Sequence, residues 1–129
     1  MSQSADYSEM ENALRQQRTE LRGEIEGQLL ESEQDQFRDI AHRVRDAGEA
    51  SVYDLVKGLE FENIERASRE LELVEHALTK FDKGQYGLCE ECGAHIEPER
   101  LRAEPAALRC LPCQEKYEIE FESRRRPSL

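Results

Sequence analysis

Proline is the residue whose distribution most restricts the fold of this chain. None occurs in the first 97 residues, whereas Pro98, Pro105, Pro112 and Pro127 all fall in the last third. Proline removes a backbone donor and clashes with the preceding turn, so it interrupts helix interiors. The distribution therefore predicts a long helical part followed by a compact, irregular part.

Apolar side chains in the proline-free part recur at helical spacing. A first stripe comprises Leu14, Leu21, Ile25, Leu29, Phe37, Ile40 and Val44. A second comprises Val52, Leu55, Leu59 and, after a phase slip near residues 60–63, Ile64, Ala67, Leu71, Val74, Leu78 and Phe81. Because neither stripe can be buried alone, we expect two helices that pack antiparallel as a coiled coil.

The segment between the stripes is short. It runs from Asp46 to Ala50 and includes Gly48, which favours a turn, while Ser51 is a candidate N-cap for the second helix. At a rise of 1.5 Å per residue each helix would be on the order of 50 to 60 Å long. We therefore expect a hairpin over residues 1–83 whose far end, at about 46–50, carries Asp46 and Glu49. Gly84 should end the second helix.

The four cysteines form two pairs with the spacing C-x2-C-x17-C-x2-C. Two such pairs supply the closed tetrahedron of thiolates that structural zinc prefers. We predict one structural zinc ion in a module over residues 84–113, and its ligands would be Cys89, Cys92, Cys110 and Cys113. Two disulfides and a thioredoxin-like site are the competing interpretations. A cytosolic setting disfavours the first, and the lack of a βαβ pattern disfavours the second.

Residues 114–129 carry mixed signals. Tyr117 to Glu122 alternate as in a strand, but Pro112 suits a first helical turn and Arg124 to Arg126 suit a helix C-terminus. We interpret the segment as a helix and tail. The expected fold is therefore mainly α: a long antiparallel coiled-coil hairpin, a small four-cysteine zinc finger and a C-terminal helix.

Charge and composition restrict the function. The net charge of −11 argues against binding DNA directly through its phosphates, and no window is apolar enough for a membrane span. The N-terminus has no signal-peptide pattern, so we expect a cytoplasmic protein. No catalytic motif is found, so we expect a monomer that is not an enzyme and that acts on a protein partner.

Several segments together resemble one family. They are Tyr86-Gly-Leu-Cys-Glu-Glu-Cys-Gly93, Ile96, Glu99-Arg-Leu-Arg-Ala-Glu-Pro105 and Cys110-Leu-Pro-Cys113, after a long acidic hairpin. This combination resembles the DksA/TraR family of bacterial transcription regulators over residues from about 10 to 120. The resemblance implies binding to RNA polymerase, with the zinc end on the rim of the secondary channel and the rod directed toward the catalytic centre. Transcription initiation, as in the stringent response, would be modulated.

The resemblance also assigns roles to single residues. The family's Asp-x-x-Asp-x-Ala tip motif aligns with Asp46-Ala-Gly-Glu49-Ala-Ser51, in which the first acid matches, Glu49 keeps the charge and Ser51 replaces alanine. Arg66 matches an arginine of the second helix that contacts polymerase. From residue types alone the favoured interpretation of the two acids is that they are solvated surface groups, and Arg66 could equally be an i,i+4 partner of Glu62 or Glu70.

The resemblance also concerns the alarmone ppGpp, which the best-known family member binds through basic side chains on the second helix, in the linker of the finger and just after the last cysteine. This chain has Leu73, Glu104 and Gln114 there. We therefore expect weak or absent ppGpp dependence.

Two other functions remain open from the sequence. One is a zinc-thiolate redox sensor, in which oxidation of the cysteines releases the metal. The other is a Gre-like accessory factor for transcript cleavage, in which the acids at the far end help to bind magnesium.

Overall fold

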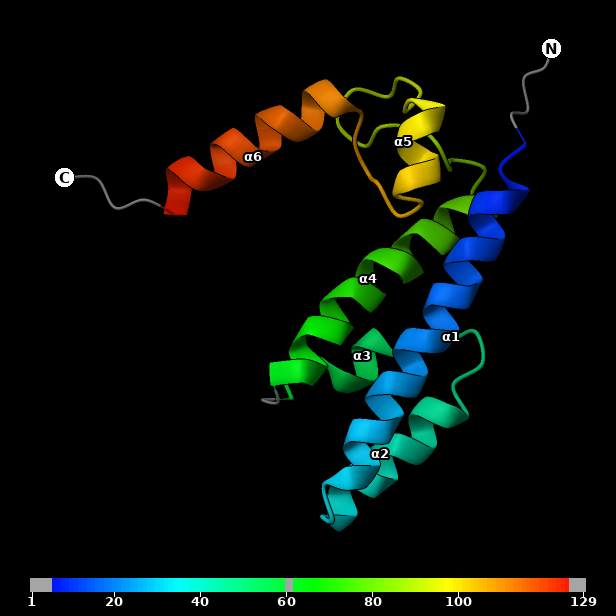
Figure 1. Ribbon diagram of the computed structural model, residues 1–129, viewed down its shortest axis with the longest axis vertical. Helices are drawn as coiled ribbons and strands as arrows, with labels where there is room; N and C mark the ends of the chain where they lie inside the picture. The colour runs from blue at the N-terminus through cyan, green and yellow to red at the C-terminus, as the bar shows by residue number, and fades with distance from the viewer. Residues whose placement is uncertain (1–5, 60–61, 126–129) are drawn as a thin grey trace.

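The structure is a computed structural model that describes residues 6–59 and 62–125. These residues form the helices α1 (Ser8–Glu31), α2 (Asp35–Arg45), α3 (Tyr53–Val56), α4 (Glu62–Asp82), α5 (Pro98–Ala103) and α6 (Leu111–Arg125). Within the described residues the only β pairing outside named strands is an isolated bridge between Leu88 and His95. The mainly α fold predicted from the sequence is confirmed (Figure 1).

The two long helices α1 and α4 lie side by side and run in opposite directions. The first stripe is buried at Leu14, Leu21, Ile25 and Leu29 of α1. The second is buried at Ile64, Ala67, Leu71, Val74 and Leu78 of α4. Both stripes therefore face the shared core, as predicted. We call α1 to α4 together the helical rod.

The far end of the rod differs from the sequence expectation. The chain turns at residues 32–34, and α2 returns along α1, against which Ala41 and Val44 are buried. Residues 46–50, expected at the far end, lie instead along the middle of α1, where Gly48 accepts a hydrogen bond from Arg22. We call the end of the rod at residues 32–34 the distal end.

A charged residue in the apolar stripe explains this turn. Glu33 lies midway between Leu29 and Phe37, four residues from each, where a continuous helix would need an apolar side chain. Burying an unpaired carboxylate is costly, so the helix stops there. Glu33 takes a positive φ of 43° and is exposed. With 24 residues, α1 is about 36 Å long, shorter than expected.

The second arm is also interrupted. Val52, not the predicted Ser51, is the N-cap residue of α3, although the Oγ of Ser51 accepts from the backbone N–H of Asp54 at 3.1 Å. However, α3 ends at Val56, just before Gly58, whose φ is 90°. The expected phase slip falls partly on residues 60–61, which lie outside the described residues, as do Arg126 and the rest of the tail.

The end of α4 follows the prediction closely. Gly84 has a φ of 68°, its N–H bonds to the carbonyl of Phe81, and that of Gln85 bonds to the carbonyl of Lys80. These two bonds are those of a Schellman motif. They end the helix and turn the chain into the cysteine module.

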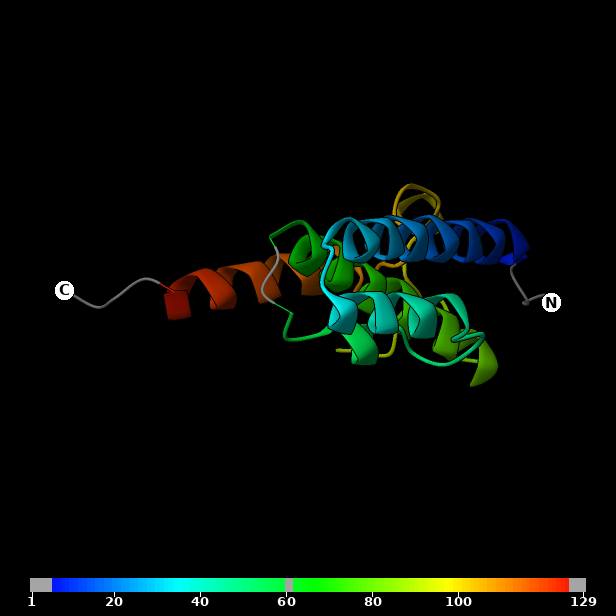
Figure 2. The same ribbon diagram turned by 90° about the horizontal axis from the view of Figure 1, so that it is seen from below.

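The helix α6 extends away from the rod, as Figures 1 and 2 show. The helical interpretation of this segment is thus confirmed. Near its start the Arg109 guanidinium lies 3.9 Å from the ring centroid of Tyr117, a cation–π contact between α6 and the segment before it. None of the described helices combines the length and apolar character needed to cross a membrane.

Replacing Leu71 by alanine should lower the free energy of unfolding by about 2 to 5 kcal/mol, because this fully buried side chain lies between α1 and α4. Urea unfolding followed by circular dichroism measures the change. Leu73→Ala is the matched control on the same helix, since that side chain is 45% exposed and its removal should have a small effect. Equal losses in the two variants would contradict the packing described here.

Candidate metal centre and its surroundings

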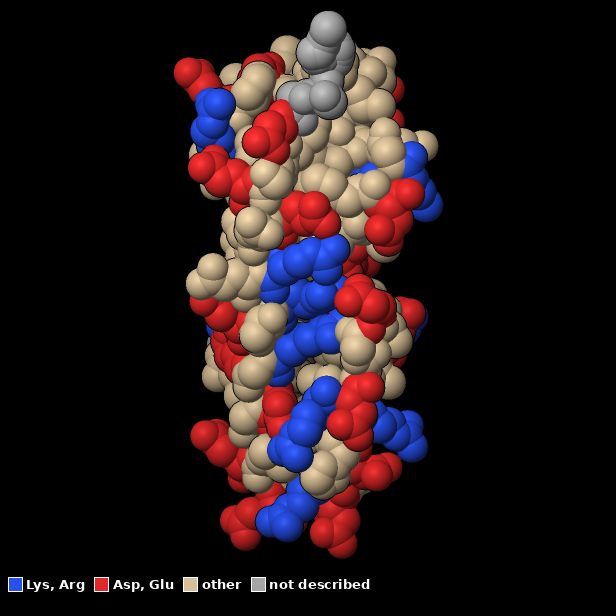
Figure 3. Space-filling model, turned by 90° about the vertical axis from the view of Figure 1, so that its right-hand side faces the viewer, with Lys and Arg blue, Asp and Glu red and all other residues tan. Residues whose placement is uncertain are grey.

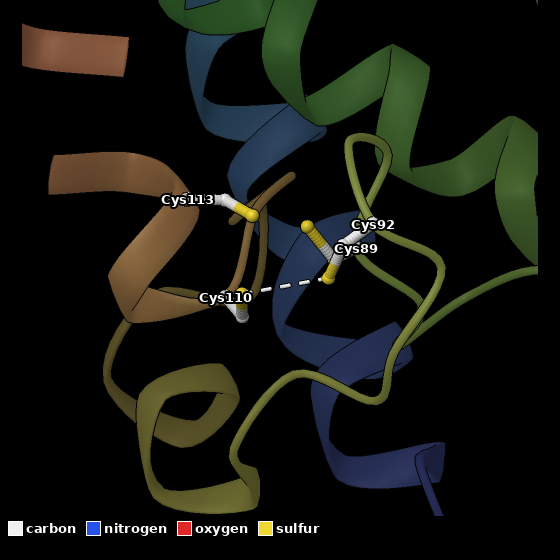
Figure 4. A group of neighbouring side chains, drawn as sticks. All are labelled: Cys89, Cys92, Cys110 and Cys113. Carbon is white, nitrogen blue, oxygen red and sulfur yellow. Dashed lines mark hydrogen bonds between the residues drawn. The ribbon is translucent and has the colours of Figure 1, made fainter. Parts of the chain in front are cut away.

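The four cysteines come from two separate turns. In the first turn the N–H of Gly93 bonds to the carbonyl of Cys89, whose own N–H bonds to the carbonyl of Ala94. The second lies at the start of α6, where the N–H of Gln114 bonds to the carbonyl of Cys110. Figure 4 shows the four side chains pointing toward one another, and their sulfur atoms all lie within 4.8 Å of each other.

This arrangement fits a tetrahedral zinc ion. With Zn–S bonds of about 2.3 Å, the sulfur atoms of a regular tetrahedron are about 3.8 Å apart. The Sγ atoms of Cys92 and Cys110 are separated by 3.9 Å. All four predicted ligands are brought together, and among the described residues His95 is not part of the group.

The thiols of the group affect one another's ionisation. Burial opposes the thiolate of Cys89, but N–H groups of Cys92, Cys110 and Glu91 donate to it and lower its pKa to about 6. A hydrogen bond to the Cys110 thiol, together with burial, raises the pKa of Cys113 to about 12. Four thiolates at such distances repel one another, and a divalent cation removes that repulsion.

Several contacts join the module to the rod. The buried Lys80 donates from Nζ to the carbonyl of Leu88 at 3.0 Å, and His76 is paired with Glu90 of the first cysteine turn. Tyr86 stacks on Phe81 with ring centroids 4.1 Å apart. These contacts fix the metal centre at one end of α4.

Gly87 allows a further close approach. A Cβ atom at this position would lie 2.6 Å from the hydroxyl oxygen of Tyr7, and the φ of 89° also favours glycine. Sequence reasoning missed Tyr7 and Lys80. Lys80 bonds to a backbone carbonyl, and such a contact leaves no pattern in the sequence.

The two acids predicted for the far end are both exposed, but neither lies there. Glu49 pairs with Arg18 of α1 at 3.3 Å. The acids at the distal end of the described structure are instead Glu31, Glu33 and Asp35, all exposed. Sequence reasoning missed this group because it placed residues 31–35 inside a continuous helix.

Arg66 joins the two long helices. Its guanidinium contacts Glu70 of α4 at 2.7 Å and Glu24 of α1 at 2.5 Å. The expected i,i+4 contact with Glu70 is therefore present, and the cross-helix contact adds to it. The side chain is 52% exposed, so it is also accessible to a partner.

The three positions associated with ppGpp line one groove. Leu73 from α4, Glu104 from the linker and Gln114 from α6 border a cavity of about 970 Å³ between the rod and α6. Other acidic residues also line it, namely Glu20, Glu24, Glu70, Glu115 and Glu118. We call it the α4–α6 groove.

Comparison with known proteins identifies the family. Residues 84–118 match the prokaryotic dksA/traR C4-type zinc finger. The chain is 30% identical over 117 residues to the RNA polymerase-binding transcription factor DksA of Salmonella typhimurium, covering 89% of this chain and 73% of that protein. This chain belongs to the DksA/TraR family.

Two further similarities bear on the DksA/TraR assignment. An uncharacterised protein of Aquifex aeolicus is 43% identical over 58 residues, which are 45% of this chain and 39% of that protein. The structure of transcription factor DksA2 from Pseudomonas aeruginosa matches with a TM-score of 0.61 and 28% identity, over 92% of this chain and 88% of that chain. The C4-type finger of the family and the clustered cysteines together support one structural zinc ion.

Removing the metal should unfold the module over residues 84–113. Structural zinc supplies roughly 10 to 16 kcal/mol of apparent binding energy to comparable peptides, and few apolar side chains are buried here besides Ile96 and Leu101. We expect one zinc per chain, released by a mercurial and detected with a chromogenic chelator, while much of the helical circular dichroism of the rod remains.

Two variants test which residues bind the zinc ion and which only lie near it. Cys113→Ser should reduce zinc retention, whereas His95→Ala should leave it unchanged. Loss of zinc in the histidine variant would contradict the four-cysteine assignment.

Proposed function

We propose that this chain is a cytoplasmic, monomeric transcription regulator that binds bacterial RNA polymerase and modulates initiation. The observation that carries the proposal is a four-cysteine module packed firmly on one end of an antiparallel helical rod, similar to DksA2 over most of both chains. The proposal includes no enzymatic activity of its own and no direct recognition of DNA. A net charge of −11 supports the second point, because phosphate contacts need cations.

The rod would enter the secondary channel of the polymerase, with the zinc module on the channel rim. Its length, about 36 Å for α1, and its acidic surface suit a passage that leads to a magnesium-containing catalytic centre. Carboxylates carried on the rod could there approach the metal or the mobile elements around it.

Binding and activity are tested in two assays. A pull-down with core polymerase should retain the chain, and in vitro initiation at a ribosomal promoter should change when it is added. Failure to bind core polymerase would contradict the proposal.

Two sets of acids compete for the active role. Asp46→Asn with Glu49→Gln should abolish the effect on initiation without loss of binding if the loop at 46–50 acts. The control set is Glu31→Gln, Glu33→Gln and Asp35→Asn at the distal end. If only the control set abolished the effect, the distal end would be the active surface and the assignment of Asp46 and Glu49 would fail.

Arg66 is proposed as a contact with polymerase. Because exposed ion pairs contribute little to stability, Arg66→Ala should barely change the urea midpoint but should weaken binding to polymerase. Arg15→Ala is a suitable control, since Arg15 is likewise half-exposed and pairs with Glu11 within α1. Equal binding by both variants would leave Arg66 with only its contacts to Glu24 and Glu70.

We further propose that ppGpp has little or no effect through the α4–α6 groove. Glutamates line this groove, and one of them, Glu104, occupies a position where the family resemblance implies a cation. An anionic ligand would be repelled there. Arg100 and Arg109 also border the groove, but each is paired with a glutamate, Glu104 and Glu91 respectively.

A gain-of-function variant tests this point. Leu73→Lys, Glu104→Lys and Gln114→Lys together should create ppGpp-dependent initiation in the polymerase assay, whereas the native chain should respond equally with and without ppGpp. A strong ppGpp response of the native chain would contradict the proposal.

A further inference from the structure

Arg22 of α1 binds the backbone of the loop at residues 46–50. Arg22 donates from Nη1 to the carbonyl of Gly48 at 2.7 Å and from Nη2 to the carbonyl of Ala50 at 2.8 Å. Its side chain is only 16% exposed. A planar guanidinium that bonds two neighbouring carbonyls fixes the path of the loop. Figure 3 shows Lys and Arg side chains in a row on this side of the molecule, with Asp and Glu on both sides.

A glutamate of α4 binds the two residues that directly follow this loop. Glu75 accepts from the hydroxyl of Ser51 at 2.9 Å and from the backbone N–H of Val52 at 2.9 Å. It also lies 3.5 Å from Arg22. The Arg22–Glu75 pair therefore connects α1, the loop and the start of α3. Charge-assisted bonds of this kind are stronger than neutral ones.

The folded-back arrangement also carries costs. The Nε atom of Arg22 is buried and has no hydrogen-bond partner among the described residues. Glu33, which makes the turn between α1 and α2, has a left-handed backbone that is unfavourable for a residue with a Cβ. Such costs reduce the stability of this arrangement relative to an alternative in which Glu33 is helical.

The sequence provides that alternative. The apolar phase of α1 continues into α2, because Leu29 and Phe37 are separated by two intervals of four residues. With Glu33 helical, residues 8–45 would form one helix. The short helix α3 is likewise followed by α4 after a break at Gly58. Straightening both breaks would give the extended hairpin, with residues 46–50 at its far end.

We propose that the chain interconverts between the folded-back rod and this extended hairpin, and that the Arg22–Glu75 pair stabilises the folded-back form. In the folded-back form Glu49 is paired with Arg18, and the loop backbone is bonded to Arg22. The loop acids are exposed in this form but lie beside the middle of α1, and the extended form places them at the far end of the hairpin. The consequence for polymerase rests on the proposed function, but the conformational change itself does not.

A distance measurement tests the interconversion directly. Spin labels are attached to azido amino acids at Thr19 and Ala50 of the zinc-loaded chain, which leaves the cysteines free to bind metal. In the folded-back form the labels are close, because Ala50 bonds to Arg22, one helical turn from Thr19. In the extended hairpin the separation is about 40 Å. The native chain should show mainly the short distance.

Three variants should affect the fraction of extended hairpin differently. Arg22→Ala should raise the extended fraction on the order of tenfold or more, because two bonds from a charged group are lost. Glu33→Gly should lower it roughly five-fold or more, since glycine tolerates the turn and weakens the continuous helix. Arg15→Ala is the control on α1 and should leave the distances unchanged. Zinc content and helical circular dichroism confirm that each variant is folded.

The results separate this inference from the proposed function. If folded Arg22→Ala keeps the native short distance, the interconversion is refuted. If Arg22→Ala gains the long distance but core polymerase binds both forms equally and its initiation activity is unchanged, the interconversion stands and the role given to the loop acids fails. If adding core polymerase to the native chain lengthens the distance, both proposals are supported.

Discussion

The repulsion among four crowded thiolates is the constraint on which the cysteine module and its placement on the rod depend. The sulfur atoms lie within 4.8 Å of one another, and a divalent cation makes that arrangement stable. The turns that carry them have few buried side chains of their own, so the metal defines their shape. Leu88, whose carbonyl accepts a hydrogen bond from Lys80, directly precedes the first ligand, Cys89. The zinc coordination therefore also sets where the module packs on the rod.

Arginine side chains also hold distant parts of this acidic chain together. Several bridge elements that are far apart in the sequence. Arg66 joins α4 to α1, Arg45 joins α2 to α1 through Glu26, and Arg22 joins α1 to the loop before α3. Carboxylates outnumber these cations, since the net charge is −11, although the side chains of Arg66 and Arg45 stay more than half exposed. This excess of negative charge supports the proposal of a protein partner rather than nucleic acid.

Sequence reasoning identified the features that local chemistry specifies. The cysteine spacing identified the ligand set, the apolar stripes identified the core of α1 and α4, and Gly84 marked the end of α4. It did not identify where the first arm turns. Helical periodicity shows which face is apolar but not whether a helix continues, so it does not reveal the turn at Glu33. Contacts made through backbone carbonyls, such as those of Lys80 and Arg22, have no sequence signature at all.

The last two ligands have a consequence for α6. Cys110 immediately precedes this helix and Cys113 lies in its first turn, so the metal ligands also anchor the start of α6. The helix exposes Tyr117, Ile119 and Phe121 to solvent. The orientation of this apolar surface therefore depends on the metal. In a metal-free chain the same side chains would be present, but their position relative to the rod would not be fixed for a docking protein.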